Sequence, residues 1–384
     1  MFQSWLMATL LFYACGIYAG EKGFFRIQSS GTTVLVGFWP DGTLVWSNAV
    51  PWSTGTVQWA DSITTPHTPW KAVHYFAASA QFMGIVLPLE PPPDGMVLIP
   101  EGSFAMGNAT NVFLWTEGYS DELPQHTVFV SGFYMDPHHV TQTRWSDVRS
   151  WGLSHGYADL PLGSWNNGTN YSKGPSHPVH LVNWFDCVKW CNARSEKDGL
   201  SPAYYVDSAF SNIYKTGEIA PYADWTANGY RLPTEAEWEK AARGGVAFRR
   251  FPWFDSHEIQ HARANYFSRT NELYDTSSTR GYHPTYATGI EPYTSPVGSF
   301  APNSHGLYDM AGNVWDWCWD WYSMTYYSVS PSVNPRGPDG PLDSRMLRGG
   351  SWYRTSFWAR VSLRGINTPT IGANYIGFRC IRGF

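Results

Sequence analysis

The sequence predicts a loop-rich α+β fold, and three observations carry this prediction. Three segments have the capping residues of helices, several short segments have the alternating pattern of strands, and long stretches between them are rich in glycine and proline. The 384 residues include 36 Gly, 27 Pro and 21 Trp, and 17% are aromatic. This composition is typical of short strands joined by loops, with tryptophans packed between them, rather than of a helical bundle.

The three helices are predicted from residues that can cap their N-termini. Thr141 and Asn183 each precede a segment with apolar residues at helical spacing. Thr234 and Glu237 form a capping box, and Gly244-Gly245 ends that helix. The other residues used are Trp145, Val148 and the stop near Gly152 for the first helix, and Trp184, Val188 and Cys191 on one face of the second.

The N-terminal part differs from the rest in its patterns. Residues 1–19 contain an apolar stretch followed by small residues, which is typical of a signal peptide, although Lys and Arg are absent from it. Export to a secreted or periplasmic location is therefore expected, with lipid anchoring as an alternative. Residues 20–90 predict a small all-β, sandwich-like domain, and the proline run of 91–95 predicts a stiff linker to a second domain, 96–384.

Charge and hydropathy argue against a nucleic-acid partner and against a transmembrane segment. The formal net charge is −5 and the pI is about 6.2, so there is no electrostatic case for nucleic acid. The N-terminal apolar run is too short and too interrupted to predict a membrane span. We expect neither a nucleic-acid partner nor a transmembrane segment.

A tryptophan-rich segment, residues 315–321, predicts a core strand. Four tryptophans alternate with Asp316, Cys318 and Asp320, and a period of two places all four indoles on one face. A carboxylate in such a segment needs a partner, because burying an unpaired charge is costly. We therefore expect a cation or hydrogen-bond donors next to Asp316.

Four separated motifs follow one another in a fixed order along the chain. They are Gly229–Glu239, Asn303–Trp317, Arg348–Trp352 and Ile376–Cys380. Together they resemble the motifs of formylglycine-generating enzymes, also called sulfatase-modifying factors. The resemblance covers roughly residues 96–384. It implies a compact variant of the C-type lectin fold with little regular secondary structure and with structural calcium.

The resemblance implies a set of calcium ligands. They would be the backbone carbonyls of Asp309, Gly312 and Val314 and the side chain of Asp316, which are hard oxygens of the kind calcium takes. The family usually has Glu where this chain has Asp316. An Asp that accepts hydrogen bonds from turn amides without a metal is the alternative. A second family site would begin at Asn265-Tyr266, but the Asp that completes it is absent.

The resemblance also assigns the cysteines. Cys191 and Cys380 match two family positions that form a structural disulfide, which export would permit. Cys187 and Cys318 remain, either as buried thiols or as a pair with each other.

The catalytic cysteines of the family are missing. The oxidases carry two cysteines after the Gly-Gly-Ser motif, which bind copper(I), whereas this chain has no cysteine between Ser351 and Phe378. Ser351 matches a family active-site serine but supplies no chemistry alone. The stretch instead holds Arg354, Trp358 and Arg360, which favour stacking and anion contacts. We expect no copper and a ligand site at these three residues, the alternative being a solvated face.

Three hypotheses for function follow. The first is an exported, non-oxidase binding or accessory module for a peptide, protein or glycan. The second is an oxidoreductase, either of the formylglycine-generating type or with a related oxidative maturation activity, that acts on sulfatases or peptides, so enzymatic activity stays open. The third is a diversified, lectin-like ligand-binding protein, whose variable positions would be Tyr353, Ser356, Phe357, Ile366, Thr370, Ile371 and Tyr375.

Overall fold

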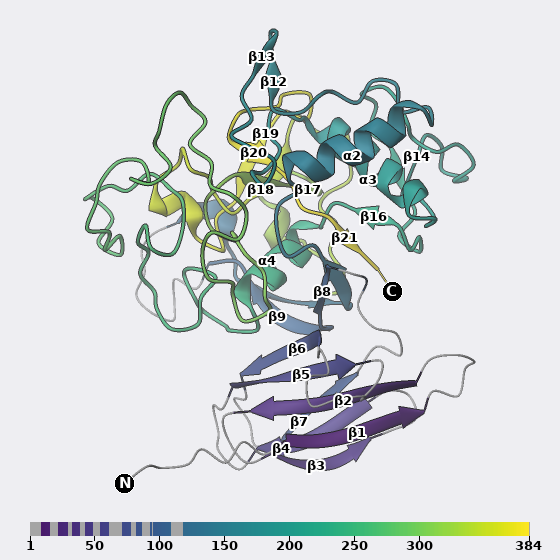
Figure 1. The fold of residues 1–384 in the computed structure, drawn as a ribbon, viewed down its shortest axis with the longest axis vertical. Coiled ribbons are helices and arrows are strands. Elements are labelled where there is room, and N and C mark those ends of the chain that lie inside the picture. Colours follow the sequence, from purple (N-terminus) through teal and green to yellow (C-terminus); the bar gives the residue numbers. More distant parts are fainter. Residues whose placement is uncertain are drawn as a thin grey trace. The chain divides into compact units, whose positions relative to one another are not determined.

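The computed structural model describes residue 93, residues 95–108 and residues 118–383, together with the strands that lie between residues 9 and 86 (Figure 1). The chain divides into two compact units. The first comprises residues 1–100 with 304–306, and the second comprises residues 101–303 with 307–384.

The first unit contains antiparallel strands. One sheet has the order β1-β2-β5-β6 and another the order β3-β4-β7. Most of the expected leader, 1–19, and of the expected linker, 91–95, lies outside the described residues, so these boundaries and the sandwich-like domain stay predictions. The strands are β1 (Thr9–Cys15), β2 (Lys22–Ser29), β3 (Thr33–Phe38), β4 (Thr43–Asn48), β5 (Thr54–Ala60), β6 (Lys71–Ala77), β7 (Phe82–Val86) and β8 (Val97–Ile99).

The helices of the second unit begin at the predicted caps. The side chains of Thr141, Asn183 and Thr234 each accept a hydrogen bond from the backbone N–H three residues later. Gly244 ends the third helix in the left-handed conformation, with φ of 58°. These contacts confirm α2 (Gln142–Leu153), α3 (Trp184–Lys197) and α4 (Glu235–Arg243).

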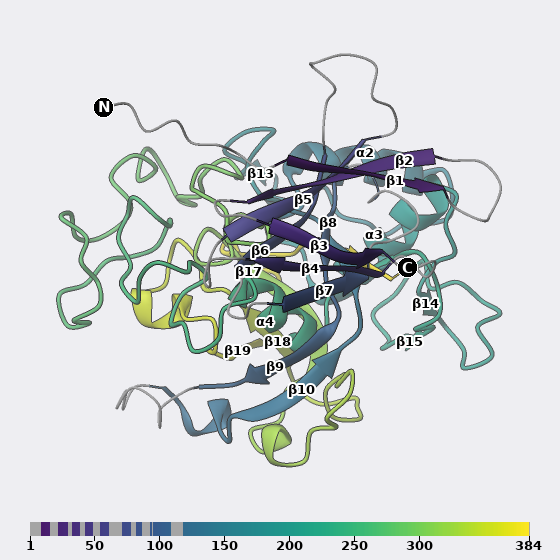
Figure 2. The same cartoon turned by 90° about the horizontal axis from the view of Figure 1, so that it is seen from below.

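Small sheets complete the second unit. The largest has the order β19-β18-β17-β20, and the C-terminal strand β21 lies between β16 and β11. Helix α4 packs against the ribbon of β9 and β10, which Figure 2 shows from below. The second unit is therefore a mixed α/β domain with few helices, as predicted. Its strands are β9 (Gly102–Met106), β10 (His126–Val130), β11 (Phe133–Met135), β12 (Trp165–Asn166), β13 (Thr169–Asn170), β14 (Tyr204–Tyr205), β15 (Tyr222–Ala223), β16 (Tyr230–Arg231), β17 (Trp315–Trp321), β18 (Arg345–Arg348), β19 (Gly365–Asn367), β20 (Ile376–Gly377) and β21 (Ile381–Arg382), and its 3-10 helices are η1 (Ser120–Glu122), η2 (Tyr326–Ser328) and η3 (Ser356–Ala359).

Strand β17 is the predicted tryptophan strand and lies in the core. It pairs with β18 on one side and β20 on the other. Both of its faces are covered, since Asp316 and Asp320 are each only 1% exposed. The guanidinium of Arg345 lies 3.7 Å from the ring centre of Trp184 and 3.4 Å from that of Trp321. Strand β17 therefore packs against a buried guanidinium group as well as against apolar side chains.

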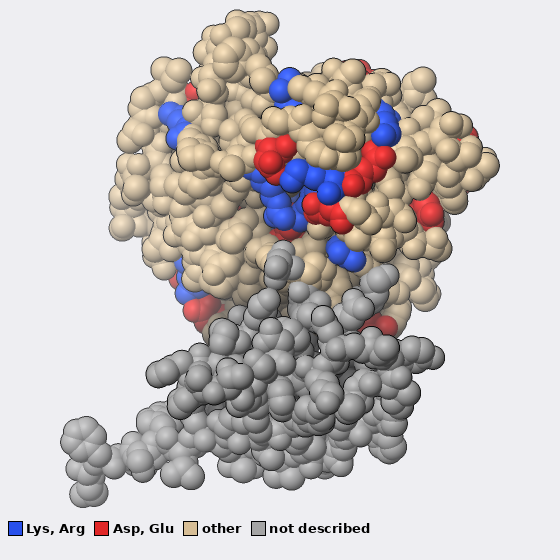
Figure 3. Space-filling view, turned by 45° about the vertical axis from the view of Figure 1, so that its right-hand side comes forward, with Lys and Arg blue, Asp and Glu red and all other residues tan. Residues whose placement is uncertain are grey.

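Buried arginine–carboxylate pairs link α4 to the C-terminal segment. Glu235 accepts from Arg364 at 2.8 Å, and Glu239 accepts from both Arg348 and Arg243. Each of these side chains is almost fully buried. On the face seen in Figure 3, the visible Lys, Arg, Asp and Glu side chains largely gather in one mixed cluster, and most of the surface is uncharged. Of the helices that the structure describes, none has the length and apolar character needed to cross a membrane.

Candidate functional site

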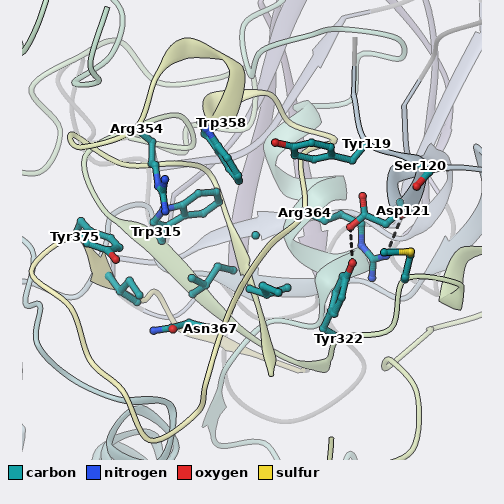
Figure 4. Close-up of a pocket in the computed structure, with 15 residues that line it drawn as sticks. Tyr119, Ser120, Asp121, Trp315, Tyr322, Arg354, Trp358, Arg364, Asn367 and Tyr375 are labelled. Atoms are coloured by element: carbon teal, nitrogen blue, oxygen red, sulfur yellow. Dashed lines mark hydrogen bonds between the residues drawn. The ribbon is translucent and has the colours of Figure 1, made fainter. Parts of the chain in front are cut away.

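A cavity of about 420 Å³ lies over the sheet β19-β18-β17-β20 in the second unit (Figure 4). Trp315 of β17, Leu347 of β18 and Ile376 of β20 contribute to its lining. Gly365 of β19 lines it too, and a Cβ atom there would lie only 2.8 Å from the Trp315 ring. Glycine at this position therefore leaves room for the indole. Other lining residues are Tyr119, Asp121, Tyr322, Arg354, Trp358 and Tyr375.

Two of the three predicted ligand-binding residues line this cavity. The guanidinium of Arg354 lies 4.9 Å from the ring centre of Trp358 and 5.8 Å from that of Tyr353. Trp358 also makes an edge contact with Trp315, with ring centres 6.2 Å apart. Arg354 and Trp358 thus form a partly exposed cation–aromatic surface that can hold a planar or anionic group.

Arg360 lies outside the cavity, which corrects the predicted ligand set. Its side chain is 2% exposed and its two terminal nitrogens donate to the two carboxylate oxygens of Glu122, each at 2.8 Å. Burial would raise the pKa of Glu122, but the adjacent Arg360 outweighs it and the pKa lies below the usual value. Arg360 therefore holds η1 against the C-terminal segment and presents no charge to a ligand.

Ser351 is also absent from the cavity lining. It is 1% exposed, and its Oγ atom has no hydrogen-bond partner among the described residues. The turn that holds it is fixed by the backbone, because Trp352 N donates to Asn313 O at 2.8 Å. Among the described residues, Ser351 Oγ therefore has no hydrogen-bonded base.

The cysteines whose side chains the structure describes are Cys187, Cys191, Cys318 and Cys380, and all four are buried free thiols. Burial raises the pKa of Cys187, Cys191 and Cys318 well above that of an ordinary thiol. The Sγ atoms of Cys191 and Cys380 lie 3.5 Å apart, so the structure places the predicted pair side by side without a bond. The disulfide, and any pairing of Cys187 with Cys318, stay predictions. None of the four lines the cavity.

The buried carboxylate of Asp316 has partners that sequence reasoning did not identify. Its Oδ2 atom accepts from Arg379 Nε and from Trp238 Nε1, each at 2.9 Å. The Nε2 atom of His139 lies 3.5 Å from Oδ1, and burial lowers the pKa of His139 to about 3, so that histidine is neutral. The partner of Asp316 is therefore Arg379, not a set of turn amides.

The predicted calcium ligands retain suitable oxygens. The Oδ1 atom of Asp316 is buried and has no hydrogen-bond partner among the described residues, whereas the backbone oxygen of Asp309, the predicted ligand atom of that residue, accepts from Arg379 Nη2 at 3.5 Å. Burial raises the pKa of Asp309 to about 6, since among the described residues only Gly298 N donates to its carboxylate. These hard oxygens fit calcium in type, while Arg379 already neutralises part of their charge.

Several of the proposed variable positions also border the cavity. Ile366 and Tyr375 line it, and Tyr353 stacks on Tyr375 with ring centres 5.4 Å apart. Ser356, in contrast, is fully buried and bonds to Glu272 at 3.2 Å. The cavity residues Tyr119, Asp121 and Tyr322 carry no local motif that marks them as part of a site, and Trp315 was predicted only as a residue of a core strand.

A mixed α/β domain of small sheets, in which two of the four motifs contribute Trp315 and Ile376 to the cavity lining, defines the class of the protein. Residues 87–384 match the family described as "Sulfatase-modifying factor enzyme 1-like domain". The chain belongs to this family.

Proteins that are similar to this chain in sequence or structure have different names. A formylglycine-generating enzyme from Streptomyces coelicolor is 34% identical over 329 residues, which cover 74% of this chain and 88% of that protein. "Chaperone protein LppX" from Paenibacillus barcinonensis is 32% identical over 278 residues, covering 71% of this chain and 83% of that protein. The solved structure of Treponema denticola variable protein 1 aligns with a TM-score of 0.58 at 26% identity, covering 77% of this chain and 99% of that one.

Proposed function

We propose that this chain is an exported, non-oxidase binding member of the family, which takes a ligand in the cavity over β17–β20. The observation that supports it is the lining: Arg354 and Trp358 take part in it, and none of the four cysteines whose side chains are described does. Export to a secreted or periplasmic location is proposed from the leader-like residues 1–19.

The chemistry of the lining favours binding over thiol–copper oxidation. Copper(I) is held by soft thiolates, which a guanidinium cannot replace. Burial raises the pKa of Cys187, Cys191 and Cys318 well above that of an ordinary thiol, which disfavours the thiolate form of these three residues. Arg354 on an aromatic face suits a carboxylate or another planar anion.

We expect no formylglycine formation when the purified protein is incubated with copper(I), oxygen and a Cys-x-Pro-x-Arg peptide. The reaction needs a redox centre, and the cavity lining offers none of the thiolates that build it in the family. Mass spectrometry of the peptide is the measurement, with the Streptomyces coelicolor relative as the positive control. Robust conversion of the cysteine would refute the proposal and favour an oxidoreductase of the formylglycine-generating type.

A diversified ligand-binding protein is the second candidate. The observation that favours it is the position of Ile366 and Tyr375 in the cavity lining, next to Tyr353. The likeness to a structure titled "variable protein 1" points the same way. An adjacent near-copy of the DNA that encodes this segment, beside a reverse transcriptase gene, would favour it over a module with a fixed ligand.

We also propose structural calcium at Asp309, Gly312, Val314 and Asp316, and expect a chelator to lower the melting temperature. An ion that binds only the folded state stabilises it by mass action. Calorimetry with chelator, and then with calcium restored, is the measurement. Asp316→Asn should remove the response to chelator. Its own destabilisation is not diagnostic, because Asp316 is also the partner of Arg379. An unchanged melting temperature of the unsubstituted protein would count against the site.

A further inference from the structure

Two groups of opposite charge line the cavity without full partners. Asp121 is 6% exposed, and its Oδ2 atom accepts from the hydroxyl of Tyr322 at 3.0 Å. Its Oδ1 atom and the Nε atom of Arg354 are buried and have no hydrogen-bond partner among the described residues. Leaving such a group unsatisfied destabilises the unliganded cavity, and more so when the group is charged. A ligand with complementary groups would remove both costs.

Arg364, the other arginine of the cavity lining, differs from Arg354 because its guanidinium nitrogens have hydrogen-bond partners. Arg364 donates through Nε and Nη2 to Glu235, at 2.8 and 3.0 Å. Its Nη1 atom donates to the backbone oxygens of Asp121 and Ser323, at 3.0 and 3.2 Å. Arg364 therefore needs no ligand. It also fixes the main chain of Asp121, so the carboxylate is held in place before a ligand arrives.

Asp121 and Arg354 do not pair with each other. Figure 4 shows them on different sides of the cavity, with the rings of Trp358 and Tyr119 between them. These two rings lie 5.9 Å apart, centre to centre, and Arg354 lies over the first. The cavity thus has an acceptor on one side, a cation on the other and an aromatic wall between them.

We infer that the cavity recognises a small zwitterion whose cationic nitrogen and anionic group lie at opposite ends of an apolar, aromatic body. The inference rests on the proposed binding function. A carboxylate oxygen accepts only, so Asp121 Oδ1 selects an N–H group, and the guanidinium of Arg354 selects a carboxylate. The aromatic body would lie against Tyr119 and Trp358. A volume of about 420 Å³ suits a ligand of this size.

The test compares probes that differ in one charge. The probes are 4-(aminomethyl)benzoate, its longer homologue 4-(2-aminoethyl)benzoate, and two analogues with a methyl group in place of one charge, 4-methylbenzoate and 4-methylbenzylamine. Calorimetric titration of the full chain should show at least one zwitterion binding about tenfold or more tightly than both analogues, because a hydrogen bond to a charged group contributes about 1.5–3 kcal/mol.

Two substitutions assign the ends of the ligand. Asp121→Asn should reduce the affinity for the zwitterion to that for 4-methylbenzoate, and Arg354→Gln should reduce it to that for 4-methylbenzylamine. Unchanged binding of 4-methylbenzoate by Asp121→Asn shows that the cavity is still formed. Asp147→Asn, an exposed residue of α2 paired with Lys197, is the matched control and should change nothing.

Other results would overturn the inference. They are an affinity for both zwitterions no higher than that for one of the singly charged analogues, or no binding of any probe at millimolar concentration. Either would leave the proposed binding function standing, because that function fails only through conversion of the cysteine peptide.

Discussion

Replacing Arg360 with methionine is expected to lower the free energy of unfolding by about 3–5 kcal/mol. The reason is the carboxylate of Glu122, which is 0% exposed and accepts two hydrogen bonds from the guanidinium. Without the cation, a charged group stays buried with Ser362 and a backbone amide as its remaining donors. Urea unfolding followed by circular dichroism measures the change.

Two further variants make this result interpretable. Glu122→Gln combined with Arg360→Met should recover part of the lost stability, because no uncompensated charge remains. Arg263→Met breaks an exposed pair with Asp255 and should cost only about 0.2–1 kcal/mol. A loss of less than about 1 kcal/mol for Arg360→Met would contradict the structural role of the pair and return Arg360 to the candidate ligand residues.

Lowering the pH below about 6.5 is expected to remove the stabilisation that two buried, neutral histidines contribute. Burial lowers the pKa of His139 to about 3 and that of His180 to about 4. As the pH falls, these two histidines therefore take up protons at a higher pH in the unfolded chain than in the folded protein. The stabilisation is fully present above the unfolded value and is lost as the pH falls through the folded values. Each histidine contributes a slope of up to about 1.4 kcal/mol per pH unit.

Variants isolate this effect from opposing groups. Burial raises the pKa of Asp186 and Asp309 to about 6, which opposes the histidines between pH 6 and 4. His180→Gln should flatten the plot of unfolding free energy against pH between 6.5 and 4, whereas His155→Gln, an exposed control, should not. A slope that His180→Gln leaves unchanged would show that this histidine titrates normally in the folded state.

The sequence predicts those parts of the fold that depend on neighbouring residues. The cap of α4 is an example, because Thr234 and Glu237 bond to each other within one turn. The strand at 315–321 is another, since its period of two is visible in the sequence. The partner of Asp316 is different. Arg379 lies far along the chain on another segment, and no local pattern connects the two residues.

The sequence predicts only part of the candidate site, because residues that are distant along the chain meet there. Arg354 and Trp358 stand where the family carries its cysteines, so the resemblance draws attention to them. Asp121 enters the cavity only because Arg364 and the Glu122–Arg360 pair hold η1 against the C-terminal segment. Arg354 and Arg360 are both arginines of the same segment. Arg360 pairs with the buried carboxylate of Glu122 and has a structural role, whereas Arg354 has no such partner among the described residues and lines the cavity.

This division along the C-terminal segment bears on how such a protein diverges. Three arginines of this segment pair with buried carboxylates: Arg348, Arg360 and Arg364. Two other residues of the segment, Arg354 and Tyr375, line the cavity and take no part in these pairs. Exchanging Arg354 or Tyr375 removes no member of those ion pairs. A gene of this kind can therefore accumulate changes in what it recognises while the polypeptide keeps folding, so new specificities are accessible by single substitutions.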